Sequence, residues 1–70
     1  MKNEYLKKIG FNIKKVREQK GLSQERLAEL VGKSRNYIGM IERGESNIPT
    51  GTLIDISTAL NVHPKTFFNF

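Results

Sequence analysis

Residues 24–43 have the sequence QERLAELVGKSRNYIGMIER, and this stretch decides the fold. Apolar residues recur at helical spacing on both sides of Gly32. They are Leu27, Leu30, Val31, Ile38 and Ile41. Ala28 is small enough to lie where two helices cross steeply, and Gly32 can adopt a positive φ in a tight turn at no steric cost. The pattern predicts a helix-turn-helix whose second helix, about residues 34–43, can enter the major groove of DNA.

Helical spacing continues on both sides of this stretch. A first helix is expected over about residues 5–20 and ends at Gly21, because glycine readily ends a helix. Ser23 and Ser34 are expected to cap the second and third helices, since a serine hydroxyl accepts a bond from an unpaired backbone N–H. The third helix is expected to end at Gly44. The sequence thus predicts helices throughout, with no alternating strand pattern.

The C-terminal third predicts two more helices. A fourth helix starts near Pro49, with Thr50 or Thr52 as its cap, and ends at Asn61, a residue that tolerates the left-handed conformation. A short fifth helix begins at Pro64, which suits the first helical position. The expected fold is therefore all-α: one compact domain of five helices over residues 1–70, with the helix-turn-helix formed by helices two and three.

Length and composition narrow the function classes. Seventy residues form one small core, and such domains often need a disulfide, a metal or a second copy for support. The chain has no cysteine and only one histidine, which excludes disulfides, zinc–thiolate sites and histidine clusters. Oligomerisation is therefore the remaining support for so small a core. Its net charge of +5, of which residues 1–20 carry +5, favours anionic partners. No apolar run approaches the roughly 20 residues of a membrane span, and there is no export signal, so we expect a cytoplasmic protein.

An enzymatic function is not expected. Asp55 and His63 are the only aspartate and the only histidine, and no Gly-x-Ser-x-Gly turn supplies a nucleophile. His63 is better explained as the residue at which the helix at Pro64 begins. The sequence also lacks a Gly-rich phosphate loop followed by Lys-Ser/Thr. We therefore expect no metal, no cofactor and no small-molecule ligand.

Three segments together resemble the Cro/cI-type helix-turn-helix family, also called the XRE family. They are VREQKGLSQERLAELVG at 16–32, SRNYIGMIERGE at 34–45 and LIDISTALNV at 53–62. The resemblance covers about residues 9–68. It implies a lambda-repressor-like DNA-binding domain of five helices that acts as a homodimer on a palindromic operator.

The resemblance also implies roles for residues of the helix-turn-helix. Gln24 matches the family's glutamine that bonds a DNA phosphate, and helix N-termini favour anions. Arg35 and Asn36 match positions used on base edges; Arg can bond guanine and Asn can bond adenine in bidentate fashion. Tyr37 could contact DNA or pack in the core. Met40, at another base-contacting position, could touch a thymine methyl, be buried or contact the second copy of a dimer.

Further DNA contacts are expected around the ends of the third helix. Arg43 and Asn47 match positions that bind the DNA backbone. Lys33 replaces an apolar turn residue of the family and could reach a phosphate. Ser34, the predicted cap, belongs to the same DNA-binding set. Glu45 stands where a basic residue is frequent, and we expect it to weaken the backbone contact.

The remaining assignments are structural. Arg17 and Glu42 match a salt bridge that joins helices one and three in many members of the family. Gly39 lies inside the third helix at a cost of roughly 1 kcal/mol relative to alanine, and either permits close approach to DNA or is merely tolerated. Phe67 and Phe70 are candidates for a dimer interface. Phe67 could instead belong to the core, which makes Phe70 the better candidate.

Two functions remain open at this stage. The first is a dimeric, sequence-specific repressor or controller, similar to phage Cro-like repressors or the controller proteins of restriction–modification systems. If the chain is complete, it has no room for a ligand-sensing domain. The second is an antitoxin-like protein that mainly binds a partner protein and binds its operator secondarily, although no extra partner-binding segment is evident.

Overall fold

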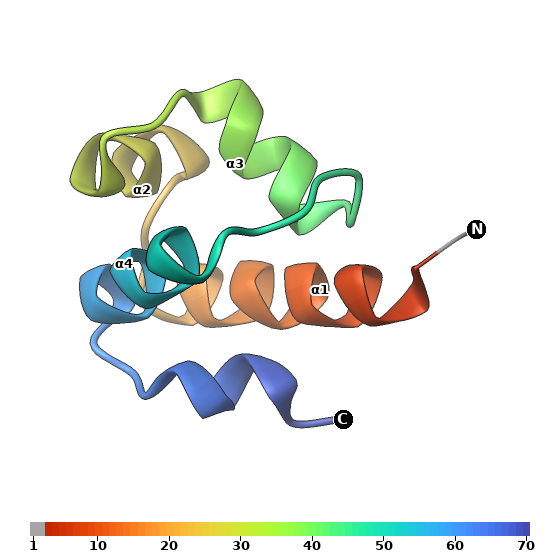
Figure 1. Ribbon diagram of the computed structural model, residues 1–70. Coiled ribbons are helices and arrows are strands. Elements are labelled where there is room, and N and C mark those ends of the chain that lie inside the picture. Colours follow the sequence, from red (N-terminus) through yellow and green to blue (C-terminus); the bar gives the residue numbers. More distant parts are fainter. Residues whose placement is uncertain (1–2) are drawn as a thin grey trace.

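The computed structural model describes residues 3–70 and is all-helical over that range (Figure 1). The α-helices are α1 (Glu4–Gln19), α2 (Gln24–Val31), α3 (Arg35–Glu42) and α4 (Thr50–Leu60), followed by the 3₁₀-helix η1 (Pro64–Phe68). The prediction of an all-α fold with a helix-turn-helix is confirmed. The short fifth helix predicted from Pro64 is a 3₁₀-helix, with an i→i+3 bond from Thr66 N to His63 O of 2.9 Å, so residues 3–70 contain four α-helices and not five.

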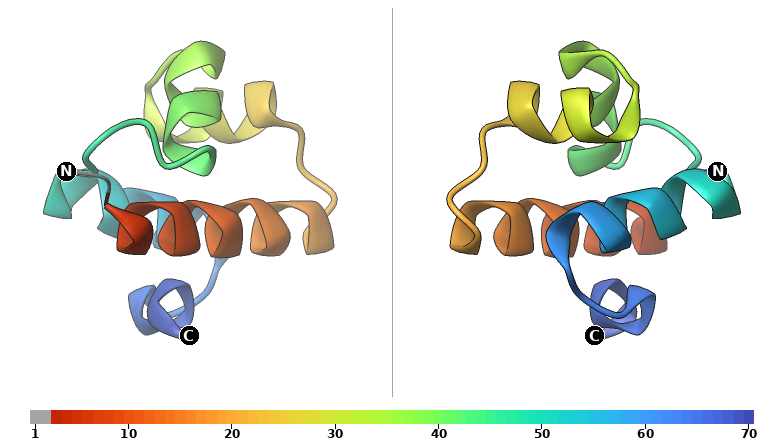
Figure 2. Two further views of the ribbon diagram at one scale, coloured as in Figure 1. Left: turned by 90° about the vertical axis from the view of Figure 1, so that its right-hand side faces the viewer. Right: turned by 90° about the vertical axis from the view of Figure 1, so that its left-hand side faces the viewer.

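Helix α1 runs through the middle of the fold. Helices α2 and α3 lie on one side of it and η1 lies on the other, as both further views show (Figure 2). The elements that pack together are α2 with α3, α1 with α3, α1 with η1, α2 with α4, and α4 with η1. The helix-turn-helix therefore lies on the opposite side of α1 from η1.

A single apolar core holds these elements together. Its largest fully buried apolar side chains come from every helix: Ile13, Leu27, Ile38, Ile41, Ile56, Leu60 and Phe67. The helical periodicity of the sequence predicted most of them. Leu30 is an exception, since it is 46% exposed and lies outside the buried stripe of α2. In a helix of eight residues, Leu27 and Ala28 already occupy the inward face.

The helix ends largely follow the predicted signals. Ser23 Oγ accepts from Arg26 N and Ser34 Oγ accepts from Tyr37 N, both at 3.0 Å. Gly32 ends α2 with φ of 68°, a left-handed conformation that costs glycine little. His63 begins η1 as predicted, with its Nδ1 accepting from Lys65 N at 3.1 Å.

The predicted cap of α4 is wrong. Pro49 occupies the cap position, without a side-chain bond to the helix, and Thr50 is already the first helical residue. Thr52 is buried within the helix. A hydroxyl can cap only from a residue that precedes the helix in extended conformation, so neither threonine can serve.

Gly10 permits a close approach of α1 to α3. A Cβ at this position would overlap Ile41 O and would lie 2.8 Å from Glu42 O. Both atoms belong to the backbone of α3, so α1 can pack against α3 at this distance only because residue 10 has no side chain. Gly10 therefore sets the position of α3 on the rest of the fold.

Across residues 3–70, no helix combines the length and the apolar character that crossing a bilayer would require.

Candidate nucleic-acid interface

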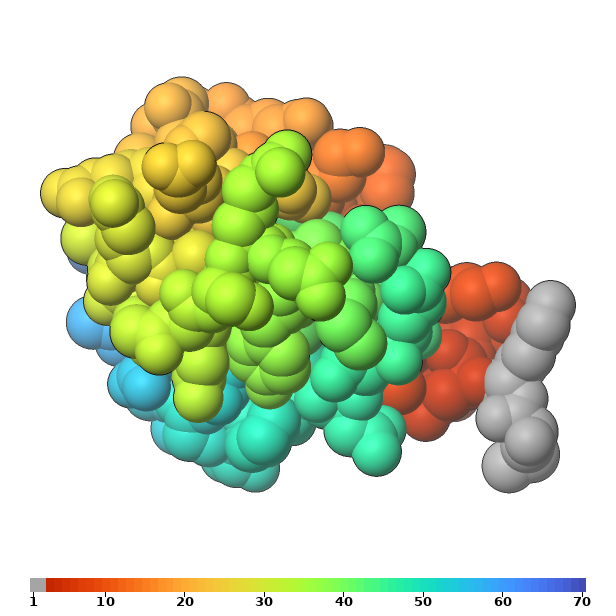
Figure 3. All heavy atoms as spheres, turned by 90° about the horizontal axis from the view of Figure 1, so that it is seen from above, coloured from red at the N-terminus to blue at the C-terminus, as the bar shows by residue number. Residues whose placement is uncertain are grey.

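The turn between α2 and α3 fixes the direction in which α3 leaves the domain. After the left-handed Gly32, Lys33 N donates to Ala28 O at 2.9 Å, which satisfies a carbonyl at the end of α2. Ser34 then caps α3, and Arg35 is its first residue. Seen from above, α2, the turn and α3 cover one face of the molecule (Figure 3).

The first turn of α3 carries polar side chains toward solvent. Arg35 and Asn36 are both exposed, and no acidic residue lies in this turn. Asn36 Nδ2 lies 3.8 Å from the sulfur of Met40, one turn further along α3. Guanidinium and carboxamide groups on the N-terminal end of a protruding helix are the groups that contact base edges in the major groove.

Tyr37 and Met40 have intermediate exposure, between the core and this polar edge. Tyr37 packs against the core, and Lys33 Nζ lies 5.7 Å from the centroid of its ring. Tyr37 therefore contributes to packing, and each of the two residues keeps some exposed surface, while their contact with DNA stays a prediction.

A buried ion pair connects α1 with α3, as predicted. Arg17 donates from Nε to Glu42 Oε2 at 2.6 Å and from Nη2 to Glu42 Oε1 at 3.0 Å, and the two side chains are 8% and 2% exposed. The hydrogen bond to Glu42 raises the pKa of Arg17 above its already high value, so the guanidinium keeps its charge within this pair. Arg17 Nη1 also donates to Leu22 O at 2.7 Å, which ties in the segment before α2.

Gln24 is the third member of this network. Its Nε2 donates to Glu42 Oε1 at 2.9 Å, which fixes the side chain at the N-terminus of α2. A carboxamide nitrogen carries two hydrogens, so one remains to donate to a ligand. The contact of Gln24 with Glu42 spans 18 residues of sequence and was not predicted, because local sequence patterns carry no signal for it.

A second ion pair lies beyond the end of α3. Arg43 Nε and Nη2 donate to the two oxygens of Glu45 at 3.0 and 3.2 Å, and both residues are exposed. The hydrogen bond from Arg43 lowers the pKa of Glu45, and that carboxylate raises the pKa of Arg43. Asn47 lies exposed in the loop between α3 and α4.

The exposed polar groups surround a shallow hollow of about 200 Å³ on the helix-turn-helix. It is lined by Gln24, Arg35, Asn36, Gly39 and Arg43. Three of the four side chains predicted to contact DNA at this hollow come from α3 or its C-cap, and Gln24 comes from α2. The lining contains two guanidinium groups and no carboxylate, which favours an anionic or strongly accepting ligand.

The two residues predicted for the dimer interface, Phe67 and Phe70, differ in their exposure to solvent. Phe67 is fully buried beneath α1, so its side chain cannot contact a second copy, and that part of the prediction is wrong. The 3₁₀ turn directs Phe67 inward and leaves Phe68 and Phe70 exposed at 47% and 55%. Asn12, which the sequence analysis did not single out, is buried and donates from Nδ2 to Phe67 O at 3.1 Å.

The profile of the helix-turn-helix family (HTH_3) matches residues 13–67. The chain belongs to this family. The match confirms the Cro/cI-type resemblance that rests on the three motifs, and residues 13–67 include the whole helix-turn-helix described above.

The relatives that the chain resembles include a transcriptional regulator and a control protein of bacteria. The chain is 46% identical over 61 residues to the HTH-type transcriptional regulator SutR of Escherichia coli, which covers 87% of the chain and 34% of SutR. It is 48% identical over 53 residues to the control protein C.SmaI of Serratia marcescens, covering 76% of the chain and 63% of C.SmaI. The chain thus spans less than two thirds of the length of either relative.

A solved structure matches nearly the whole chain. The restriction-modification controller protein C.AhdI of Aeromonas hydrophila superimposes with a TM-score of 0.91 at 39% identity, covering 94% of this chain and all of the C.AhdI chain. The arrangement of helices in this chain is therefore similar to that of C.AhdI.

Proposed function

We propose that this protein is a sequence-specific transcriptional regulator, a repressor or controller, that binds a palindromic DNA operator as a homodimer. The observation that carries the proposal is the polar hollow on the helix-turn-helix, where Arg35 and Asn36 lie exposed beside Gln24 and Arg43. Membership in a family with regulators and controller proteins among its members supports the same conclusion.

In this proposal α3 lies in the major groove. Arg35 and Asn36 contact base edges, and Met40 offers its apolar side chain to the same groove. Gln24, held by Glu42, donates its remaining hydrogen to a phosphate. The other residues of the predicted DNA-binding set are Lys33, Ser34, Tyr37, Arg43 and Asn47. Phosphate contacts fix the orientation of the domain, while the base contacts supply specificity.

Selection of bound sequences from a random DNA pool tests this function. The selected operator and a scrambled duplex are then titrated with the protein between 50 and 200 mM salt. If a dimer makes roughly 6–10 phosphate contacts, its affinity should fall by about 10³–10⁵ over this range. Failure to select any sequence, together with a flat salt dependence, would favour the alternative of an antitoxin-like protein that binds a protein partner.

Two variants separate sequence recognition from backbone binding. Arg35→Ala should cost about 1–3 kcal/mol per base contact and relax the preference at one position of each half-site. Gln24→Ala should weaken binding to operator and scrambled DNA by similar factors, without altering the preferred sequence. If Gln24→Ala rearranged the base preference and Arg35→Ala left it unchanged, the placement of α3 in the major groove would be wrong.

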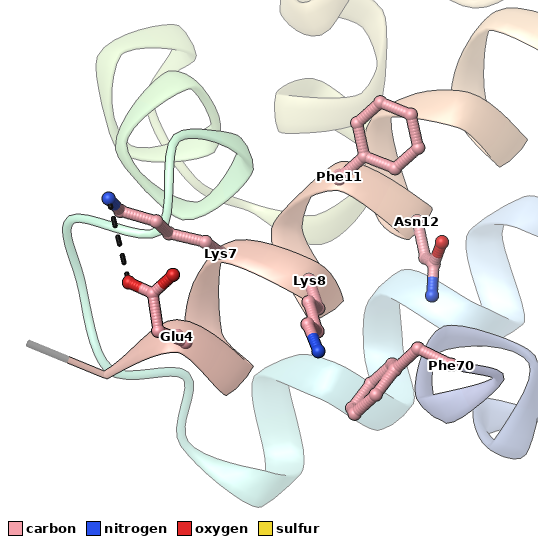
Figure 4. Close-up of a pocket in the computed structure, with 6 residues that line it drawn as sticks. All are labelled: Glu4, Lys7, Lys8, Phe11, Asn12 and Phe70. Atoms are coloured by element: carbon pink, nitrogen blue, oxygen red, sulfur yellow. Dashed lines mark ion pairs between the residues drawn. The ribbon is translucent and has the colours of Figure 1, made fainter.

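The homodimer is proposed to involve Phe70. Its ring lies 5.7 Å from that of Tyr5, and Lys8 Nζ lies 5.5 Å from its centroid. Phe70 and Phe11 border a hollow of about 360 Å³ beside the first turns of α1, where both rings are more than half exposed (Figure 4). Exposed aromatic rings grouped in this way are typical of an interface.

Sedimentation of the protein at micromolar concentration tests the dimer. Wild type should exceed the 8.0 kDa of one chain, and Phe70→Glu should return it to that mass. Ile54→Glu, which charges another half-exposed apolar side chain on α4, is the matched control. If only Ile54→Glu dissociated the dimer, the interface would lie at α4 and not at Phe70.

A further inference from the structure

The Arg43 side chain is held in a defined direction over α3. Its Nε and Nη2 are both bonded to Glu45, which leaves Nη1 as the guanidinium nitrogen without a bond to that carboxylate. A Cβ at Gly39 would lie 3.0 Å from Nη1, closer than a methyl group normally approaches a nitrogen. A methyl group at residue 39 would therefore push the guanidinium away from α3 by a few tenths of an ångström.

This direction brings Arg43 to the polar hollow. Gly39 lines the hollow between Arg43 on one side and Gln24 on the other, and a Cβ at Gly39 would lie 3.8 Å from Gln24 Nε2. The same hollow is bordered by Arg35. Donors from α2, from the first turn of α3 and from its C-cap thus face one small space with no carboxylate in its lining.

We propose that Gly39 and Glu45 are positioning residues, which direct Arg43 Nη1 into this hollow to donate to a DNA phosphate. Gly39 supplies the space, and Glu45 fixes the plane of the guanidinium by a bidentate pair. The proposal rests on the proposed DNA-binding function and assigns to it two residues that contact no DNA themselves.

Glu45 would then support DNA binding through Arg43, in addition to repelling phosphates. A carboxylate near DNA repels phosphates, and on that ground the sequence analysis expected it to weaken the backbone contact. A bidentate carboxylate also removes much of the rotational freedom of an exposed arginine, so that less freedom is lost when the arginine binds. Glu45 is bonded to Nε and Nη2 of Arg43 and Gly39 lies beside Nη1, so the effects of both residues on binding should depend on Arg43.

A cycle of variants in the full chain tests the role of Gly39. Gly39→Ala should weaken binding to the selected operator and to scrambled DNA alike, by about tenfold for one charge-assisted hydrogen bond, and should reduce the salt slope by about 0.9 per protomer. In an Arg43→Ala background, the same substitution should have no further effect. The melting temperature should not fall, because alanine is the better helix former.

Gly51→Ala is the matched control. It places the same methyl group in α4, where nothing lies within 4 Å of the position. It should leave DNA affinity and salt slope unchanged. A loss of affinity in this variant would show that added helix stability, rather than the position of Arg43, governs binding.

Glu45→Gln tests the second positioning residue. The substitution removes a charge that repels DNA and also releases Arg43. We therefore expect it to strengthen binding more in the Arg43→Ala background than in wild type, where the loss of orientation offsets the gain.

Three results would overturn the proposal. The first is an unchanged affinity for Gly39→Ala, and the second is an equal loss with and without Arg43, which would mean that the new methyl group meets DNA directly. The third is an equal gain for Glu45→Gln in both backgrounds. If wild type itself bound no DNA with salt-dependent affinity, the proposed function would fail as well, whereas the three results above leave that function intact.

Discussion

Removal of Glu42 should destabilise the fold more than any exposed ion pair could explain. Glu42→Ala leaves Arg17 buried, with Leu22 O as its remaining partner at 2.7 Å. Breaking a buried pair by removing one partner costs about 3–5 kcal/mol, because the other charge stays uncompensated. A chain of 70 residues has roughly 4–10 kcal/mol of stability in total, at about 0.05–0.15 kcal/mol per residue. The substitution should therefore remove about half of it.

Urea unfolding followed by circular dichroism measures this loss directly. The corresponding fall in melting temperature is about 12–40 °C, at roughly 4–8 °C per kcal/mol for a domain of this size. Glu29→Ala is the matched control, because Glu29 pairs with Arg26 at 3.2 Å while both side chains are more than half exposed. That variant should lose at most about 0.5 kcal/mol.

The reasoning is refuted if Glu42→Ala costs no more than Glu29→Ala. A second test is the double replacement Arg17→Met with Glu42→Leu, which removes both charges and keeps apolar volume. It should recover most of the lost stability, since apolar replacement of a buried pair is often neutral or stabilising. A double variant as unstable as Glu42→Ala would mean that the carboxylate acts through something other than Arg17.

Three further outcomes follow from contacts elsewhere. Gly10→Ala should destabilise by about 1–3 kcal/mol in urea unfolding, because its methyl group meets the backbone of α3, whereas Gly51→Ala should be neutral or stabilising by up to about 1 kcal/mol; equal effects would contradict the close packing at Gly10. Asn12→Ala should cost about 1–3 kcal/mol and speed hydrogen exchange near the C-terminus, because it leaves Phe67 O buried without its donor; unchanged exchange there would argue against that bond. An NMR titration should give Glu45 a lowered pKa that rises in Arg43→Ala. The pair then stabilises the fold at pH values above the pKa of an ordinary glutamate, and this contribution is lost as the pH falls through the lowered pKa of Glu45. An identical Glu45 pKa in wild type and in Arg43→Ala would mean that the pair does not form.

The sequence predicted most of the helix boundaries, because their signals are local. Gly21, Gly32 and Gly44 all adopt positive φ, as does Asn61, and each follows the end of a helix. A cap or a left-handed residue depends on three or four neighbours, so a short window contains the necessary information. The start of α4 is the exception. The sequence offers Thr50 beside Pro49 as a cap, and only the backbone conformation shows that Pro49 holds the cap position while Thr50 is already helical.

Burial was harder to predict where a helix is short. Leu30 fits the helical spacing of α2 as well as Leu27 does, yet Leu27 is fully buried and Leu30 is 46% exposed. Likewise Phe67 and Phe70 are equally apolar, and the path of η1 decides that Phe67 is buried and Phe70 is not. Periodicity identifies the possible inward positions, but the packing partner determines which of them are covered.

One oxygen atom of Glu42 belongs both to the structural ion pair and to the proposed DNA-binding site. Glu42 Oε1 accepts from both Arg17 and Gln24, at 3.0 and 2.9 Å. The buried pair that sets α3 on α1 therefore also holds the side chain proposed to bind a phosphate. The double replacement of Arg17 and Glu42 should consequently restore folding without restoring DNA affinity, because Gln24 then lacks its acceptor. Since Gln24 and Arg17 share this oxygen, a substitution at either residue should alter the contribution of the other.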